Sequence, residues 1–132
     1  MGALQERDIV LGVSGSIACY KAADIASKLA QAGALVDVVL TSSAQRFVTA
    51  LTFRSLTHRP VVADLFDPDS ELAVEHVALA ERADAVLIAP ATAHVIAKLA
   101  AGLVDDALTA MVLATTAPVL LAPAMDAKMY EA

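Results

Sequence analysis

The residues near the N-terminus with the clearest chemical potential are small and polar. Gly12, Ser14, Gly15 and Ser16 lie within the stretch DIVLGVSGSIA at 8–18. A short apolar run ends in this turn, and an alanine-rich helical pattern follows at once. A strand, a tight turn and a helix start expose backbone N–H groups beside the positive end of a helix dipole, which favours anions. We therefore expect a phosphate-bearing ligand at 14–17.

The same stretch also fits a plain strand-to-helix turn, in which the glycines serve only the backbone geometry. The spacing of Gly12 and Gly15 does not match G-x-G-x-x-G, and the sequence contains no G-x-x-x-x-G-K-[ST]. A phosphate at this turn would therefore belong to neither of the two commonest nucleotide-binding classes.

Three further apolar runs end in small or polar residues. The run at 35–40 is followed by Thr41 and Ser42, which could bond the ligand or cap the next helix, and capping is favoured for such residues in isolation. In parallel sheets, ligands bind outside the carboxyl ends of the strands. We therefore expect one site made of four loops, at 14–17, 41–43, 90–94 and 122–126.

Strand and helix patterns alternate along the chain, which predicts a single-domain, doubly wound α/β fold with a parallel, Rossmann-like sheet. The apolar run at 85–89 is expected to be a central strand. Helices are expected after the first turn and at 74–83, 95–101 and 105–114. The acidic, turn-rich segment 64–72 is the best candidate for a mobile loop.

The composition excludes several classes of protein. A net charge of −6 without a Lys/Arg cluster argues against nucleic acid, and the single cysteine, Cys19, excludes an intrachain disulfide and a multi-cysteine metal site. No apolar run reaches the ~18 residues of a membrane span. The N-terminal segment carries Glu6 and Asp8 and lacks the basic and apolar regions of a secretory signal, so we expect a cytoplasmic protein. The hydrophobic fraction of 58% is high and predicts an oligomer.

Five motifs in order carry a resemblance to a known family. They are VSGSIACYKA, RFVTALTF, VEHVALAERADAVLIAPATA, KLAAGLVDDAL and LLAPAMDAKMY, between residues 9 and 130. Each motif is only moderately specific, but all five in this order are hard to obtain by chance. The chain resembles the FMN-dependent cysteine decarboxylase flavoproteins, which implies FMN as the cofactor and no metal.

The resemblance also implies the residues that hold FMN. Contacts with its phosphate or ribityl chain would come from Gly15, Ser16 and Ile17, and contacts with the phosphate end from Thr41 and Ser42. Phe47 would pack near the flavin, although simple core packing explains it equally. The family's small-residue loop, through which backbone amides approach the flavin, corresponds to Pro90, Ala91, Thr92 and Ala93.

The implied activity is oxidative decarboxylation of a cysteine carboxylate, with 4′-phosphopantothenoylcysteine as substrate and 4′-phosphopantetheine as product. His76 matches the family's active-site histidine. A position in the first turn of a helix would keep its imidazole neutral and able to accept the proton of the substrate thiol. Without the resemblance, a histidine on a partly exposed helix would explain the residue as well.

The substrate contacts implied by the resemblance are Met125, Asp126, Met129 and His94. Two of them depart from the family, which has asparagine at positions 94 and 126. An ionised Asp126 would repel the substrate carboxylate, at a cost of roughly 1 kcal/mol if wet and several if desolvated. Three solutions stay open: a protonated Asp126, compensation by a cation such as Lys128, or a substrate held differently.

The resemblance implies a homotrimer or homododecamer and a synthetase domain or subunit as partner. Residues 1–132 are expected to form one FMN-binding domain that lacks the family's C-terminal substrate lid and its proton-donating cysteine. Two alternative functions stay open. One is decarboxylation of the C-terminal cysteine of a peptide, and the other is a catalytically silent, regulatory FMN-binding protein.

Overall fold

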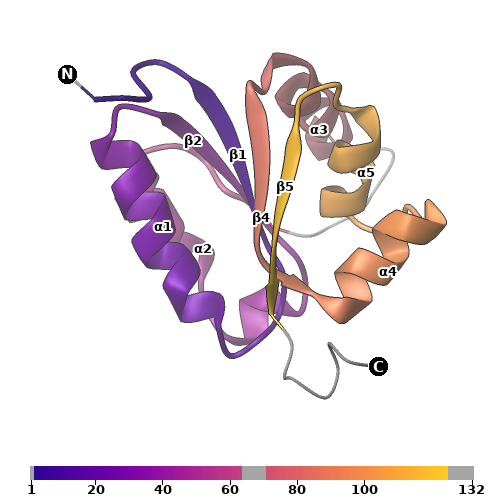
Figure 1. The fold of residues 1–132 in the computed structure, drawn as a ribbon. Coiled ribbons are helices and arrows are strands. Elements are labelled where there is room, and N and C mark those ends of the chain that lie inside the picture. Colours follow the sequence, from indigo (N-terminus) through magenta and orange to yellow (C-terminus); the bar gives the residue numbers. More distant parts are fainter. Residues whose placement is uncertain (1, 64–70, 125–132) are drawn as a thin grey trace.

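The computed structural model describes residues 2–63 and 71–124, the side chains of 71–76 and 124 excepted (Figure 1). Within these residues the strands are β1 (Asp8–Val13), β2 (Leu35–Leu40), β3 (Val62–Ala63), β4 (Ala85–Thr92) and β5 (Val119–Ala124). The α-helices are α1 (Cys19–Gln31), α2 (Ala50–Thr57), α3 (Glu71–Arg82), α4 (Ala93–Ala101) and α5 (Ala107–Ala114), and a 3₁₀ helix, η1, covers Ala44–Arg46.

The strands form one parallel sheet in the order β3-β2-β1-β4-β5. The chain therefore builds outward from β1 to β3, then crosses back to β4 and continues to β5. This order confirms the predicted doubly wound fold. The hydrophobic run of β4 is paired on both sides, as expected for a central strand, although the middle position belongs to β1. The reversal between β1 and β4 is where ligands bind in such sheets.

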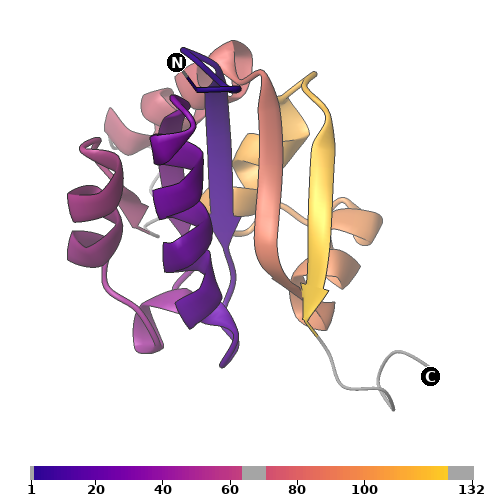
Figure 2. The ribbon, with the colours of Figure 1, turned by 60° about the vertical axis from the view of Figure 1, so that its left-hand side comes forward.

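Helices cover both faces of the sheet. Helices α1 and α2 lie on one face, and α3, α4 and α5 lie on the other (Figures 1 and 2). Side chains of β1, β2 and β4 alternate between the two faces, as the period of a strand requires. The larger buried residues under α1 and α2 are Leu11, Val13, Val36, Val38, Leu40 and Phe53. Those under the other layer are Val10, Val39, Val86, Ile88, Leu108 and Met111.

The ends of several elements differ from the sequence predictions. Residues 90–94 are not a loop, because β4 pairs with β5 again at Ala91 and Thr92 after a shift of register, and α4 begins at the next residue. The Ala89–Pro90 peptide bond is cis. Likewise β5 continues through 122–124, where a loop was expected. The expected mobile segment 64–72 lies outside the described residues, apart from the start of α3 at Glu71.

Two glycines end helices in the left-handed backbone region. Gly33 follows α1 with φ of 95°, and Gly102 ends α4 with φ of 70°. Residues other than glycine adopt these backbone angles with difficulty. Of the helices described, none combines the length and hydropathy that crossing a bilayer would require.

Candidate functional site

A cavity of about 300 Å³ lies where the carboxyl ends of β1, β2 and β4 meet, at the lower end of the size range of ligand pockets. Its lining residues come from three of the four loops predicted to converge and from the α4–α5 region. They are Gly15, Thr41, Ser42, Ser43, Thr92, His94, Val95, Lys98, Asp105 and Asp106. The structure therefore brings together Gly15, Thr41, Ser42, Thr92 and His94 of the predicted site.

The turn after β1 leaves backbone donors unpaired at the start of α1. The hydroxyl oxygen of Ser16 accepts the N–H of Ala18 at 2.9 Å, but no side chain caps the helix from its N-cap position. Within the described residues, the N–H groups of Gly15 and Ile17 have no acceptor. Unpaired amides near the positive end of a 13-residue helix are the donors that a bound anion needs, so the geometry supports the phosphate site expected at 14–17, which stays a prediction.

The first turn is joined to the end of β4 by Ser14, a buried residue. Its hydroxyl donates to the carbonyl oxygen of Pro90 and accepts the N–H of Thr92 at 3.0 Å. The N–H of Ser14 also donates to the Pro90 carbonyl, at 3.3 Å. These bonds fix the two strand ends on either side of the reversal in strand order. The sequence indicated Ser14 only as part of the turn, because its partner lies 76 residues away in the chain.

Cys19 supports the same turn from inside. Its thiol donates to the carbonyl oxygen of Ser14 at 2.8 Å and accepts the N–H of Ser16 at 3.4 Å. Burial raises the pKa of the Cys19 thiol, and the hydrogen bond from Ser16 offsets this only in part. The thiol therefore stays protonated at neutral pH and serves as a structural donor.

The loop after β2 supplies the second wall of the cavity. The hydroxyl of Thr41, a buried residue, accepts the N–H of Ala44, the first residue of η1, at 3.1 Å. This bond agrees with the capping interpretation, although the N-cap position itself is Ser43, whose side chain makes no cap bond. Ser42 and Ser43 line the cavity beside it. Phe47 follows η1 and is 55% exposed, so the alternative of simple core packing is wrong. It is available to contact a ligand or another chain.

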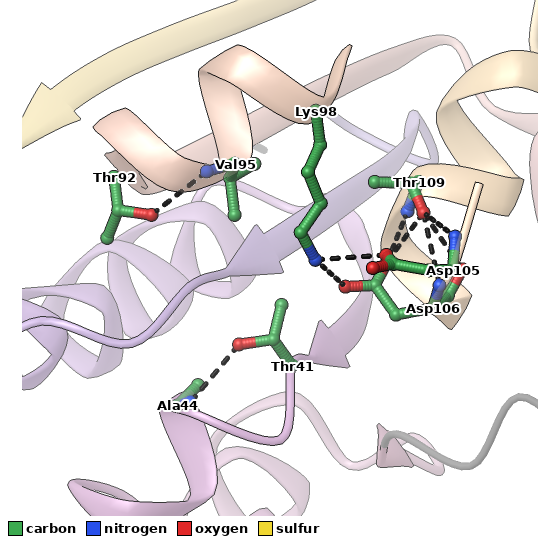
Figure 3. Close-up of polar contacts among 8 residues, drawn as sticks. All are labelled: Thr41, Ala44, Thr92, Val95, Lys98, Asp105, Asp106 and Thr109. Atoms are coloured by element: carbon green, nitrogen blue, oxygen red, sulfur yellow. Dashed lines mark hydrogen bonds and ion pairs between the residues drawn. The ribbon is translucent and has the colours of Figure 1, made fainter. Parts of the chain in front are cut away.

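The α4–α5 side of the cavity carries a charged cluster (Figure 3). The Lys98 ammonium on α4 donates to Asp105 at 3.0 Å and to Asp106 at 3.3 Å, just before α5. Asp106 caps α5 by accepting the N–H and hydroxyl of Thr109, both at 2.8 Å. The predicted helix from Asp105 therefore begins two residues later, because Asp106 serves as its N-cap. The motif KLAAGLVDDAL contains this cluster, but spacing alone did not reveal its pairing.

The contacts within the cluster favour the charged forms of Asp106 and Lys98. Burial alone would raise the pKa of Asp106, but its bonds from Thr109 and the charge of Lys98 outweigh burial and lower that pKa. Burial alone would lower the pKa of Lys98, but the bonds and charges of Asp105 and Asp106 raise it. Lys98 and Asp106 are therefore ionised at neutral pH. The lysine is balanced by two carboxylates, so the amides of the first turn remain the better place for a phosphate.

Not every predicted site residue faces this cavity. Pro90 borders a second cavity of about 320 Å³ between α1 and the β4–β5 end, with Lys21, Ile25 and Pro123 among its other lining residues. Ala91 is buried in the sheet, and Ala93 is the first residue of α4. Met125, Asp126 and Met129 lie outside the described residues. Among the described residues, no group of three His, Cys, Asp or Glu side chains is placed to hold a metal.

His76 lies in α3, but its side chain is not among those that the structure describes. The helix begins at Glu71, three residues before its predicted start, so His76 is in the second turn. The effect of the helix dipole falls off within the first turn. The expectation that the dipole keeps this imidazole neutral therefore loses its physical basis. The earlier start includes the acidic residue Glu71, which the sequence analysis assigned to a loop.

A parallel α/β sheet with a cavity at the reversal of strand order and unpaired amides at a helix start is typical of doubly wound domains that bind phosphate-bearing ligands. The comparison with protein families makes this class specific. The chain belongs to the flavoprotein family, whose model, described as "Flavoprotein", matches residues 2–132. Family membership supports a flavin as the class of cofactor.

The similar curated proteins are coenzyme A biosynthesis bifunctional proteins CoaBC. The protein from Vibrio cholerae is 48% identical over 130 residues, which cover 98% of this chain and 33% of the relative. The protein from Bacillus subtilis is 50% identical over 128 residues, which cover 97% of this chain and 32% of the relative. The chain thus spans about a third of the length of these relatives.

The similar solved structures include FMN-dependent cysteine decarboxylases. TvaF, from thioviridamide biosynthesis, is 36% identical with a TM-score of 0.82, and the match covers 93% of this chain and 76% of that one. A PPC decarboxylase mutant complexed with pantothenoylaminoethenethiol is 28% identical with a TM-score of 0.79, covering 97% and 72%. The fold predicted from the sequence is therefore that of solved flavin-dependent decarboxylases.

Proposed function

We propose that this domain binds FMN and decarboxylates a cysteine carboxylate, with 4′-phosphopantothenoylcysteine as substrate and 4′-phosphopantetheine as product. The relatives named for coenzyme A biosynthesis and the PPC decarboxylase structure support this choice. The structural observation that carries it is the unpaired amide of Gly15, which lines the cavity at the end of β1, together with the unpaired amide of Ile17 two residues later, just before α1.

The phosphate end of FMN fits the first turn. Two amides and the start of a long helix supply donors and partial positive charge for a dianion. The hydroxyls of Ser16, Thr41 and Ser42 lie on the same two loops and extend the set of donors. Gly15 is needed here for space, since an added Cβ would lie 2.6 Å from the backbone carbon of Ser43. The residues present therefore fit the group.

The remaining FMN contacts follow the family. In this proposal Phe47 packs near the flavin, and the segment Pro90, Ala91, Thr92 and Ala93 approaches it with small side chains. The exposure of Phe47 and the place of Thr92 on the cavity wall support these assignments. When bound, FMN supplies two-electron redox chemistry that the side chains of this chain lack.

His76 is proposed as the base that accepts the proton of the substrate thiol. Met125, Asp126, Met129 and His94 are proposed to hold the substrate, and His94 lines the described cavity. The role of Asp126 requires that its negative charge be neutralised, by a proton or by a cation, before a carboxylate can lie beside it.

The proposed assembly is a homo-oligomer, a trimer or a dodecamer, that works with a synthetase domain or subunit in the cytoplasm. Exposed apolar side chains support the assembly, because Ile17, Tyr20, Phe47 and Leu51 lie on the elements that flank the first two loops. Exposed clusters of this kind are typical of protein contacts. The bifunctional names of the relatives support the second partner.

Anaerobic incubation of the purified, FMN-loaded protein with 4′-phosphopantothenoylcysteine tests the proposal. We expect release of carbon dioxide and transient loss of the visible flavin absorption. A parallel incubation uses a peptide that ends in cysteine, because TvaF belongs to the biosynthesis of thioviridamide. Turnover of the peptide alone would overturn the substrate assignment. FMN binding without reaction of either compound would overturn the enzyme assignment in favour of a silent flavin-binding protein.

A further inference from the structure

Asp37 is a buried carboxylate in the middle of β2, on the side of the sheet away from α1. Its side chain is 8% exposed. Arg59 binds it in a two-point contact, from Nε to Oδ1 at 2.9 Å and from Nη2 to Oδ2 at 3.3 Å. Arg82 adds a third bond, from Nη2 to Oδ2 at 3.3 Å. A carboxylate buried this deeply needs such partners, because an unpaired charge is costly to bury.

The two arginines lie at the two ends of the segment 59–82. Arg59 lies between α2 and β3, and Arg82 is the last residue of α3. Asp37 therefore joins both ends of the 59–82 segment to a central strand. Arg82 also lies 4.0 Å from the carboxylate of Asp8 on β1. The hydrogen bond with Asp37 raises the pKa of Arg59, so its positive charge is permanent.

Apolar packing of α3 against the sheet comes from Leu79 and Ala80, which are buried in the core layer on this face. A cavity of about 190 Å³ lies beside the ion pairs, lined by Pro60, Val61 and Val62 on one side and by Ala78 and Leu79 on the other. Helix α3 packs mainly on α5. Where side chains do not interdigitate, packing restrains a helix less. The bond from Arg82 to Asp37 therefore adds a polar restraint on α3 relative to β2 where the apolar packing leaves a cavity.

We propose that Asp37 is a positioning residue for the decarboxylation, because its bonds to Arg59 and Arg82 fix the segment that carries His76 against the sheet. The proposal rests on the function proposed above. His76 lies six residues before Arg82 on the same helix. A shift of α3 would therefore displace His76, while the first turn and the loop after β2, which are proposed to hold the FMN phosphate, would keep their places.

Four variants test the proposal: Asp37→Asn, Arg82→Met, Arg82→Lys and Arg59→Lys. Asp37→Asn and Arg82→Met are expected to lower kcat about tenfold or more, as misplacement of a reacting group does, with KM and the Kd for FMN unchanged. Arg82→Lys is expected to restore kcat, because Arg82 makes a single bond to Asp37. Arg59→Lys is expected to leave kcat below that of the parent, since one ammonium cannot replace a two-point contact.

The matched control is Asp24→Asn, which removes an exposed partner of Lys28 on α1 and is expected to change nothing. A second readout needs no substrate: the NMR signals of the His76 imidazole, assigned by their loss in His76→Asn, should shift in Asp37→Asn.

An unchanged kcat and an unchanged His76 signal would overturn the proposal. So would a parallel loss of kcat, FMN binding and folded protein without rescue by Arg82→Lys. If the parent protein does not decarboxylate its substrate, the proposed function fails, and the His76 signal still tests the restraint by Asp37.

Discussion

Gly15 and Ser43 are in such close contact that a Cβ added to the glycine would lie 2.3 Å from the Cβ of Ser43. The contact joins the turn after β1 to the loop after β2. These two segments form the wall of the cavity that is proposed to hold the FMN phosphate. The position therefore requires glycine because of a close approach between two loops.

The variant Gly15→Ala is expected to push the two loops apart. Overpacking of this kind costs about 1–3 kcal/mol of the free energy of unfolding. If about 1.4 kcal/mol of that strain is relieved by opening the phosphate site, the Kd for FMN rises tenfold. Urea denaturation and a fluorescence titration with FMN measure the two effects.

Gly102→Ala is the matched control. A Cβ at Gly102 would meet nothing within 4 Å, but the φ of 70° is unfavourable for alanine. We expect a loss of about 1 kcal/mol in stability without a change in FMN affinity. Equal FMN affinity in Gly15→Ala and the parent protein would contradict the assignment of this turn.

Ser14→Ala is expected to loosen the connection between β1 and β4. The substitution removes the donor to the Pro90 carbonyl and leaves the N–H of Thr92 without its acceptor. The loss of a buried bonding partner costs about 1–3 kcal/mol, which chemical denaturation can measure. Ser27→Ala, on α1, removes a hydroxyl that accepts only an exposed bond from Gln31. Its stability should stay close to that of the parent, and an equal loss in both variants would contradict the role of Ser14.

Acid should weaken the α4–α5 connection through Asp106. The pKa of Asp106 is lowered in the folded protein, so the folded state releases this proton more readily than the unfolded state. The resulting stability is present above the unfolded value, about 3.9, and is lost as the pH falls through the lower, folded value. Asp106→Asn keeps a side chain that caps helices well but removes the titration. We therefore expect a shallower loss of stability below about pH 4, measured by urea denaturation at stepped pH. The control is Asp24→Asn, which removes an exposed carboxylate paired with Lys28. A change of the acid limb in Asp24→Asn as large as that in Asp106→Asn would contradict the role of Asp106.

His76→Asn is expected to abolish most of the decarboxylation while FMN still binds. Loss of a general base lowers kcat by about 10²–10⁴-fold. His58→Asn is a suitable control, because His58 ends α2 with φ of 60°, a conformation that asparagine tolerates. Bleaching of the flavin at the parental rate in His76→Asn would remove His76 from the mechanism.

The sequence by itself determined the order of the elements and the class of the fold. Apolar runs that alternate with helical periods specify strands and helices locally, and this alternation leads to a parallel sheet covered on both faces. The small and polar residues at the strand ends, such as Ser14 and Thr41, marked the edge where the cavity lies. The motifs in order also indicated the family that the comparison with protein families shows.

Only the tertiary structure decided which of these residues meet. Ser14 bonds with residues near position 90, Asp37 binds Arg59 and Arg82, and Gly15 packs on Ser43. None of these partnerships leaves a signal in the local sequence, because each depends on the register of the strands and on which faces of the sheet the loops reach. Pairing with β5 extended β4 where the sequence predicted a loop. The early start of α3 moved His76 out of the first turn. Local patterns specify the elements, whereas long-range packing sets their ends and their partners.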